Sequence, residues 1–240
     1  MDPHNGDLHP ALAYAESPLD NPVWSALTSY QSALAIGDTL ARRYPGDISP
    51  FAAVSEQSAR AFAALAALVA TQETVVLFGG ELPPSEHWKL SQQRHVIQMV
   101  YEQRSTAESD GAVEIAPLTA ADVPAMLALT ALTHPGPFLP HTIELGSYLA
   151  IRQNGQLAAM AGERFHLEGY REISAVCTHP AFTKRGYARR LVTNLINWHG
   201  KTGIIPFLHV MQENVGAIAL YESLGFTRRT VLPLLRLQRQ

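Results

Sequence analysis

The sequence has a single cysteine, Cys177, in 240 residues. One thiol cannot form an intrachain disulfide, so we expect a cytoplasmic protein rather than a disulfide-stabilised secreted domain. The amino-terminal MDPHNGDLHP lacks the charged and apolar regions of a secretory signal. The longest apolar run, FAALAALVA at 62–70, is shorter than the roughly 20 residues that cross a bilayer. We therefore expect a buried helix there and no membrane partner.

The sequence also lacks a basic excess, because its formal net charge is −3. A protein whose whole surface binds nucleic acid normally carries many more cations than anions, so we expect no nucleic-acid partner. Hydrophobic residues make up 47% of the chain, which is ample for buried cores. Acidic residues are absent from the forty positions between Glu172 and Glu213. Any anion-binding site is therefore local, and this segment is where we expect it.

Composition and periodicity divide the chain into three parts. Residues 1–20 are rich in Pro, Asp, His and Asn and predict a loose arm, and the polar run 102–112 predicts a linker. Between them, residues 21–110 predict a smaller α/β domain. It has a short helix after Asn21, a helix at 58–70 and strands at 74–79 and 96–101.

Residues 111–240 have a more regular pattern of strands and helices. Asn154-Gly155 is a strong hairpin signal between the strands expected at 147–153 and 156–165. The other elements follow in order: strands at 113–118, 172–178 and 205–210, helices at 122–133, 186–199 and 214–224, and a last hydrophobic pair of strands.

Cations gather where a strand is expected to turn into a helix, in THPAFTKRGYARRLV at 178–192. Lys184, Arg185, Arg189 and Arg190 surround Gly186 here. A helix amino terminus offers unpaired N–H groups and a partial positive charge, and glycine lets an anion approach the backbone. The turn therefore predicts a diphosphate site, and its alternative is a solvated, charged helix start.

This stretch resembles the phosphate-binding signature of the GNAT superfamily of acetyl-CoA-dependent N-acetyltransferases. That signature is Arg or Gln, two residues, Gly, one residue, then Gly or Ala. The matching positions are Thr183, Lys184, Arg185, Gly186, Tyr187 and Ala188. Thr183 departs from the usual Arg or Gln, and Lys184 stands where many members carry glycine.

A second block, PFLHVMQENVGAIALYESLGF at 206–226, resembles the later GNAT motif and matches it at Asn214, Ala217, Leu220, Tyr221, Gly225 and Phe226. The resemblance covers about 113–240 and is greatest to a two-domain branch with an extra N-terminal domain. It implies an α/β (α+β) fold. A central mixed, mostly antiparallel sheet would be flanked by helices, with the smaller α/β domain packed on it.

The resemblance also implies an activity, the transfer of an acetyl group from acetyl-CoA to a primary amine by direct attack in a ternary complex. The amine-bearing acceptor, a small molecule or a peptide, would approach between 122–133, the loop at 135–138 and the last strands. The residues implied to contact acetyl-CoA are Val176, Cys177, Thr178, Thr183, Lys184, Arg185, Gly186, Tyr187, Ala188, Arg189, Asn214 and Tyr221.

Two residues are candidates for catalysis. Tyr221 is expected to protonate the departing thiolate, because a phenol holds its proton at neutral pH; its alternative is a core tyrosine. Glu172 lies eleven residues before Thr183, the offset of the general base in the histone-acetylating branch, and its alternatives are a surface charge and an ordered water as base. Asn214 is expected to cap a helix, to contact the cofactor, or both.

Several alternatives complete the interpretation. The histidines lack metal-binding spacing, so we expect no metal. Cys177 lacks a nearby cation and is not expected to act as a nucleophile. A catalytically degenerate GNAT-like domain that binds acyl-CoA as a sensor or scaffold is the alternative function. A homodimer is compatible with the sequence, which does not determine the oligomeric state.

Overall fold

The computed structural model describes residues 17–103 and 113–240. A three-stranded sheet has the order β1-β2-β3, and an eight-stranded sheet has the order β4-β11-β5-β10-β9-β8-β7-β6. The strands are β1 (Ile36–Gly37), β2 (Ala41–Arg43), β3 (Ala52–Val54), β4 (Thr74–Phe78), β5 (Trp88–Tyr101), β6 (Ala116–Pro117), β7 (Tyr148–Gln153), β8 (Gln156–Leu167), β9 (Tyr170–Thr178), β10 (Ile205–Met211) and β11 (Phe226–Arg239).

The α-helices are α1 (Pro22–Thr28), α2 (Ala59–Ala67), α3 (Val123–Thr133), α4 (Tyr187–Gly200) and α5 (Val215–Ser223). Within the described ranges, none of them is long and apolar enough for a membrane crossing. Among the described strands of the large sheet, only β9 and β10 pair in parallel. The predicted fold class, a mixed and mostly antiparallel sheet flanked by helices, is confirmed.

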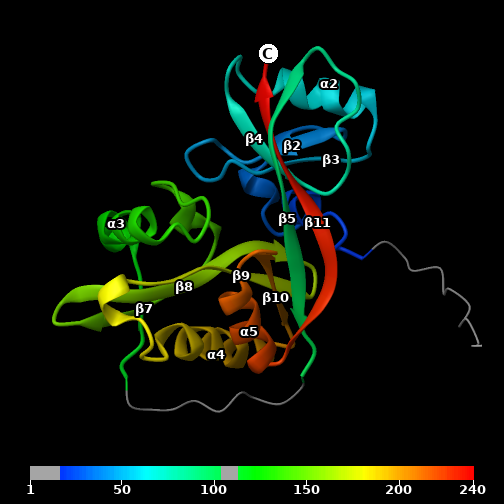
Figure 1. Ribbon diagram of the computed structural model, residues 1–240. Helices are drawn as coiled ribbons and strands as arrows, with labels where there is room; N and C mark the ends of the chain where they lie inside the picture. The colour runs from blue at the N-terminus through cyan, green and yellow to red at the C-terminus, as the bar shows by residue number, and fades with distance from the viewer. Residues whose placement is uncertain (1–16, 104–112) are drawn as a thin grey trace, which may run out of the picture.

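The large sheet takes strands from both predicted domains. β5 pairs antiparallel with β11 along its whole length, from Trp88 opposite Arg239 to Tyr101 opposite Phe226, and lies between β11 and β10. Figure 1 shows these two long strands running side by side from one end of the molecule to the other. Most of the predicted linker lies outside the described residues, as does the predicted arm except for 17–20. The strands on either side of the linker share one sheet.

Two strand predictions were wrong. The expected terminal pair of strands is the single strand β11, and β5 begins at Trp88 instead of at residue 96. Strand pairing explains both differences. Residues 88–94 of β5 pair with residues 234–239 of β11, and β4 pairs with the opposite edge of the same part of β11. Sequence alternation alone does not reveal such a distant partner.

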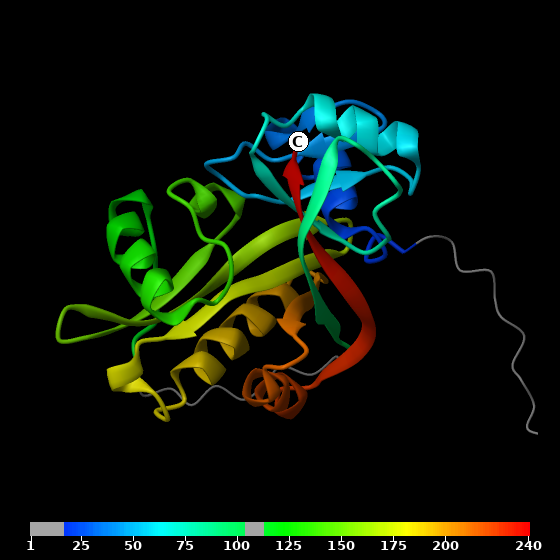
Figure 2. The same ribbon diagram turned by 45° about the horizontal axis from the view of Figure 1, so that its top comes forward.

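Helices cover both faces of the sheet. On β7, Leu149 and Ile151 join the core under α4 and α5, while Tyr148 and Ala150 join the core under α3. In Figure 1 α3 lies above these strands and α4 below them. Figure 2 shows α2, in cyan, at the end of the molecule where β11 finishes. Successive side chains of β7 therefore point to opposite faces of the sheet and are buried in two separate cores.

The predicted hairpin and helix start are confirmed. Asn154 and Gly155 both have positive φ, at 52° and 79°, as a two-residue turn between twisted strands requires, and they join β7 to β8. α4 begins directly after Gly186, whose φ of 76° favours glycine.

The side chain of Gln31 forms hydrogen bonds that connect the segment before β1 to the large sheet. Its side-chain Nε2 donates to the backbone oxygens of Leu145 (3.0 Å) and Arg164 (2.7 Å), and its Oε1 accepts from the Tyr44 hydroxyl at 2.6 Å. All of these polar atoms are away from water, since Gln31 is 5% exposed and Tyr44 is fully buried. The loss of one such side chain leaves several buried groups without a partner.

We predict that Gln31→Ala lowers the free energy of unfolding by about 2–4 kcal/mol, because each unsatisfied buried group costs about 1–3 kcal/mol and some of them relax. Urea unfolding measures this difference. The exposed Gln212 provides the control, and Gln212→Ala should change stability by less than about 0.5 kcal/mol. Equal stability of the two variants would contradict the stabilising role of the Gln31 hydrogen bonds.

Candidate active site

A cleft opens where β9 and β10 part. The two strands pair in parallel only from Tyr170 opposite Ile205 to Glu172 opposite Phe207. Beyond this point β10 continues beside β5 and β9 beside β8, and no further pair joins β9 to β10 within the described residues. The cleft between them has a volume of about 950 Å³. One edge of β9 therefore keeps its backbone groups for a ligand.

A β-bulge distorts β9 beside this cleft. The pair Gly162–Ser174 is followed by the pair Met160–Cys177, so β9 spans one more residue than β8 over this interval. Ala175 lies in the bulge with a φ of 52°, a left-handed conformation that costs a non-glycine residue about 1 kcal/mol or more. The bulge changes the direction of β9 just before residues 176–178.

Seven of the predicted site residues line the cleft together, from one strand, a turn and a helix. They are Val176, Cys177, Thr178, Thr183, Lys184, Asn214 and Tyr221. The first three belong to β9, the next two to the turn before α4, and the last two to the start and the body of α5. The structure thus brings together residues that are up to 45 positions apart in the sequence.

The turn before α4 is open at its backbone. Lys184 and Gly186 both have positive φ and both are exposed, and Gly186 caps α4 without a side-chain hydrogen bond. Apart from Gly186 and its two neighbours in the chain, no heavy atom lies within 4 Å of the point where a Cβ of Gly186 would be. The first N–H groups of α4 have no side-chain cap and no intrahelical partner, which suits a diphosphate.

Three predicted cofactor residues direct their side chains elsewhere. The Arg185 guanidinium lies 5.3 Å from the ring centre of Phe182, and Arg189 Nη2 donates to Ser223 Oγ at 2.6 Å. Tyr187 is 6% exposed and packs in the core under α4. Only the backbone of these residues, or a guanidinium that leaves its present contact, can reach a phosphate.

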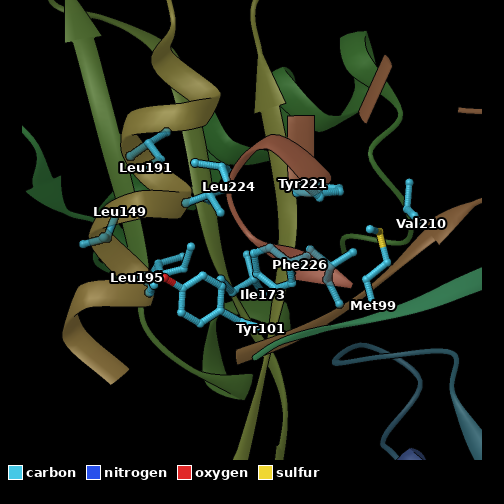
Figure 3. Packing of buried hydrophobic residues seen from close by; sticks show 14 of the residues in the cluster. Met99, Tyr101, Leu149, Ile173, Leu191, Leu195, Val210, Tyr221, Leu224 and Phe226 are labelled. Carbon is cyan, nitrogen blue, oxygen red and sulfur yellow. The ribbon is translucent and has the colours of Figure 1, made fainter. Parts of the chain in front are cut away.

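Tyr221 reaches the cleft from α5. Its ring packs edge-on against Phe226, with 5.9 Å between the ring centres, and Figure 3 shows it in the core beside Leu224 and Phe226. Burial raises the pKa of Tyr221 above its ordinary value, with a smaller contribution from Cys177. The phenol is therefore protonated at neutral pH and able to donate.

Asn214 and Cys177 complete this part of the cleft. Asn214 Oδ1 accepts a hydrogen bond from the backbone N–H of Ala217 at 3.1 Å, which confirms the predicted helix cap. Burial raises the pKa of the Cys177 thiol to about 11. At neutral pH this residue therefore has almost no thiolate.

Glu172 lies behind the wall of the cleft. Its fully buried carboxylate accepts from Arg164 at two positions, Nε–Oε2 2.8 Å and Nη2–Oε1 2.5 Å, and Oε1 lies 2.7 Å from His209 Nδ1. Burial alone would raise the pKa of Glu172, but Arg164 and His209 outweigh it and lower the pKa to about 2. The structure does not support the prediction that Glu172 takes the amine proton, because an enclosed carboxylate with so low a pKa is a weak base.

Gln98 holds the other side of His209. Gln98 Nε2 lies 3.1 Å from His209 Nε2 and donates to the backbone oxygen of Leu19, while Gln98 Oε1 accepts from Arg229. The amide nitrogen therefore faces the ring, so His209 accepts at Nε2 and donates from Nδ1 to Glu172. Burial lowers the pKa of His209, against the opposing effect of Glu172, and the ring is neutral at pH 7.

Arg164, Phe51 and Phe78 are among the residues lining the cleft that the sequence analysis missed. The Arg164 guanidinium carbon lies 4.6 Å from the ring centre of Phe51 and 5.9 Å from that of Phe78. A charged pair, Glu163 and Arg164, inside the otherwise apolar strand at 156–165 was the available signal. Within the described residues, no cluster of histidine, cysteine, aspartate and glutamate is suited to a metal ion.

Comparisons with known proteins agree with this architecture. A family model described as FR47-like protein matches residues 148–232. The ribosomal protein bS18-alanine N-acetyltransferase of Escherichia coli K12 is 32% identical over 49% of this chain and 82% of its own length.

Two solved structures extend the likeness to nearly the whole chain. A GNAT-family acetyltransferase structure from Novosphingobium aromaticivorans is 34% identical, with a TM-score of 0.87 over 94% of this chain and 100% of that chain. A GCN5-related N-acetyltransferase from Kribbella flavida shares the fold, at 16% identity and a TM-score of 0.60 over 90% of this chain and 93% of its own. The likeness therefore includes strands β4 and β5 from the first half of the sequence.

We predict that Glu172→Gln lowers the free energy of unfolding at pH 7 by about 3–5 kcal/mol, because the buried Arg164 guanidinium loses its counter-ion. The pKa of Glu172 is lower in the folded protein than in the unfolded chain. Its stabilising contribution is therefore present above about pH 5 and is lost as the pH falls toward about 2.

Chemical denaturation of wild type and Glu172→Gln at pH 7 and pH 3 tests this. The difference between them should be smaller at pH 3. The matched control is Glu222→Gln, which breaks an exposed ion pair with Arg228 and should cost less than about 1 kcal/mol. A difference that does not depend on pH would contradict the assigned ion pair.

Proposed function

We propose that this chain, which belongs to the GNAT family of acetyltransferases, transfers the acetyl group of acetyl-CoA to a primary amine by direct attack in a ternary complex. The chain is an acyltransferase, as its similarity to N-acetyltransferases shows. The observation that carries the proposal is the cleft between β9 and β10, which has Tyr221 in its wall and the open amino terminus of α4 beside it.

Two features of the chain fit the coenzyme. The unpaired edge of β9 at Val176, Cys177 and Thr178 offers backbone N–H and C=O groups to the amides of the pantetheine arm. The turn at Gly186 and the first N–H groups of α4 bind the diphosphate, with Lys184 adding a positive charge. Thr183 replaces the usual Arg or Gln without removing this backbone site.

The bound thioester supplies an electrophilic carbonyl carbon. The neutral amine attacks this carbon, so that the C–N bond forms and the C–S bond breaks. Tyr221 donates its proton to the departing thiolate, and its own proton is restored from the positively charged nitrogen of the product through water. The raised pKa of Tyr221 keeps this proton in place until the thiolate forms.

No carboxylate is available in the cleft to remove the proton of the amine. Among the described residues that line it there is no aspartate or glutamate, and Glu172 is engaged by Arg164 and His209. The acceptor therefore enters as the free base or loses its proton to water. Cys177 is protonated, which favours direct transfer over an acyl-enzyme at this residue.

The acceptor class is part of this proposal. The E. coli relative is named for the alanine of a ribosomal protein, so a peptide amino terminus belongs in the first panel of acceptors, together with small amines. The cytoplasmic location expected from the single thiol is also part of the proposal. The alternative, a degenerate domain that binds acyl-CoA as a sensor, would bind the coenzyme without turnover.

We predict thiol release from acetyl-CoA when the protein is given a panel of amines, amino acids and peptides. A thiol-reactive dye measures the rate, and calorimetry measures coenzyme binding in the same preparation. Binding without release by any acceptor would favour the sensor, and the absence of both would contradict the proposed function.

We predict that Tyr221→Phe lowers kcat by at least about tenfold, because the thiolate loses its acid, and changes the Kd of acetyl-CoA by less than about threefold. Tyr30→Phe, at an exposed tyrosine, is the control and should leave kcat unchanged. An unchanged kcat in Tyr221→Phe would remove the acid from the mechanism.

A further inference from the structure

The cleft continues beyond the thioester end into a second cavity of about 360 Å³. The two cavities share six lining residues: Phe51, His134, Gly136, Pro137, Met211 and Leu234. The second cavity adds Arg94 and Arg236 on the large sheet. The two cavities form one groove, which runs from Tyr221 across the surface of β11 and β5.

The middle of the groove is lined mainly by apolar side chains, with the Arg164 guanidinium against the ring of Phe51. Phe51 and Phe78 stack with 5.1 Å between their ring centres and 9° between their planes, and Leu234 pairs in register with Phe78. Val96 lines the same stretch from β5. An acceptor that passes through this part of the groove therefore needs an apolar body of its own.

The far end of the groove is cationic. Strand register places Arg94 opposite Leu234 and Arg236 opposite Gln92, so both arginines lie on the face of the sheet that carries Leu234. Both side chains are exposed. Among residues 17–103 and 113–240, no side chain forms an ion pair with Arg236, and Arg94 has only a distant contact with Glu213, at 3.8 Å. An exposed pair of this kind contributes little.

The rest of the groove does not offset this charge. Within the described residues that line either cavity there is no aspartate or glutamate. The nearby carboxylate of Glu172 is buried and neutralised by Arg164. The groove thus has three zones in order: a thioester site, an apolar stretch and a pair of arginines.

We propose that the acceptor is a small amphiphilic amine whose amino group is joined through an apolar chain to an anionic group, a carboxylate or a phosphate. This inference rests on the proposed function and adds the class of acceptor to it. The amine meets the thioester beside Tyr221, the apolar chain lies against Phe51, Phe78 and Leu234, and Arg94 and Arg236 bind the anion.

The test compares two acceptors of equal length that differ only at their far end, ω-aminooctanoate and octylamine. Both are assayed at the same pH and low ionic strength, because their amines ionise alike and salt screens the arginines. We expect the ratio of kcat/KM for ω-aminooctanoate to that for octylamine to be about ten or more. Aminooctyl phosphate, as a third acceptor, distinguishes a preference for phosphate from one for carboxylate.

The double variant Arg94→Gln with Arg236→Gln should reduce this ratio by about tenfold. Arg228→Gln is the matched control: it changes an arginine on β11 that lines neither of these two cavities, and it should keep the ratio. Equal turnover of the two amines by the wild type, or a ratio that survives the double variant, would overturn the inference and leave the proposed function intact. No thiol release with any amine would overturn both.

Discussion

The separation of β9 and β10 is the constraint on which the rest of the site depends. The two strands share only three paired positions before they diverge, and each then stays with its other neighbour. A sheet that closed at this point would hide the backbone edge of residues 176–178. Because the sheet remains open, one ligand can touch a strand edge, a helix start and a phenol at the same time.

A buried polar network lies below this opening. Arg164, Glu172 and His209 come from β8, β9 and β10, and Gln98 of β5 completes the series across the sheet. Their hydrogen bonds join four neighbouring strands just where β9 and β10 stop pairing with each other. The network lies at the closed end of the cleft, and its contacts engage both carboxylate oxygens of Glu172.

The first half of the chain completes the proposed acceptor groove. Phe51 and Phe78 lie in segments that resemble no catalytic motif, yet they line the cleft because β4 and β5 belong to the same sheet as β11. The long pairing of β5 with β11 places the two halves in a fixed relation to each other. The acceptor groove that we propose is therefore built by the whole chain and not by the family motifs alone.

The sequence predicted what depends on local patterns. Asn154-Gly155 predicted the hairpin, and Gly186 predicted the start of α4. Asn214 predicted a helix cap, and the two motifs predicted the family. It could not predict the partner of residues 88–94 or the contacts of Glu172, because both depend on strands that are distant in the sequence. A charge in a strand can be exposed or buried in a pair, and only the fold decides which.

A crystal structure of the protein with coenzyme A tests the central claim most directly. The account predicts that the diphosphate lies on the backbone N–H groups at Gly186 and the start of α4, that the pantetheine arm follows residues 176–178, and that the sulfur lies within hydrogen-bonding distance of the Tyr221 hydroxyl. A coenzyme bound outside the cleft between β9 and β10, or one whose sulfur points away from Tyr221, would contradict it.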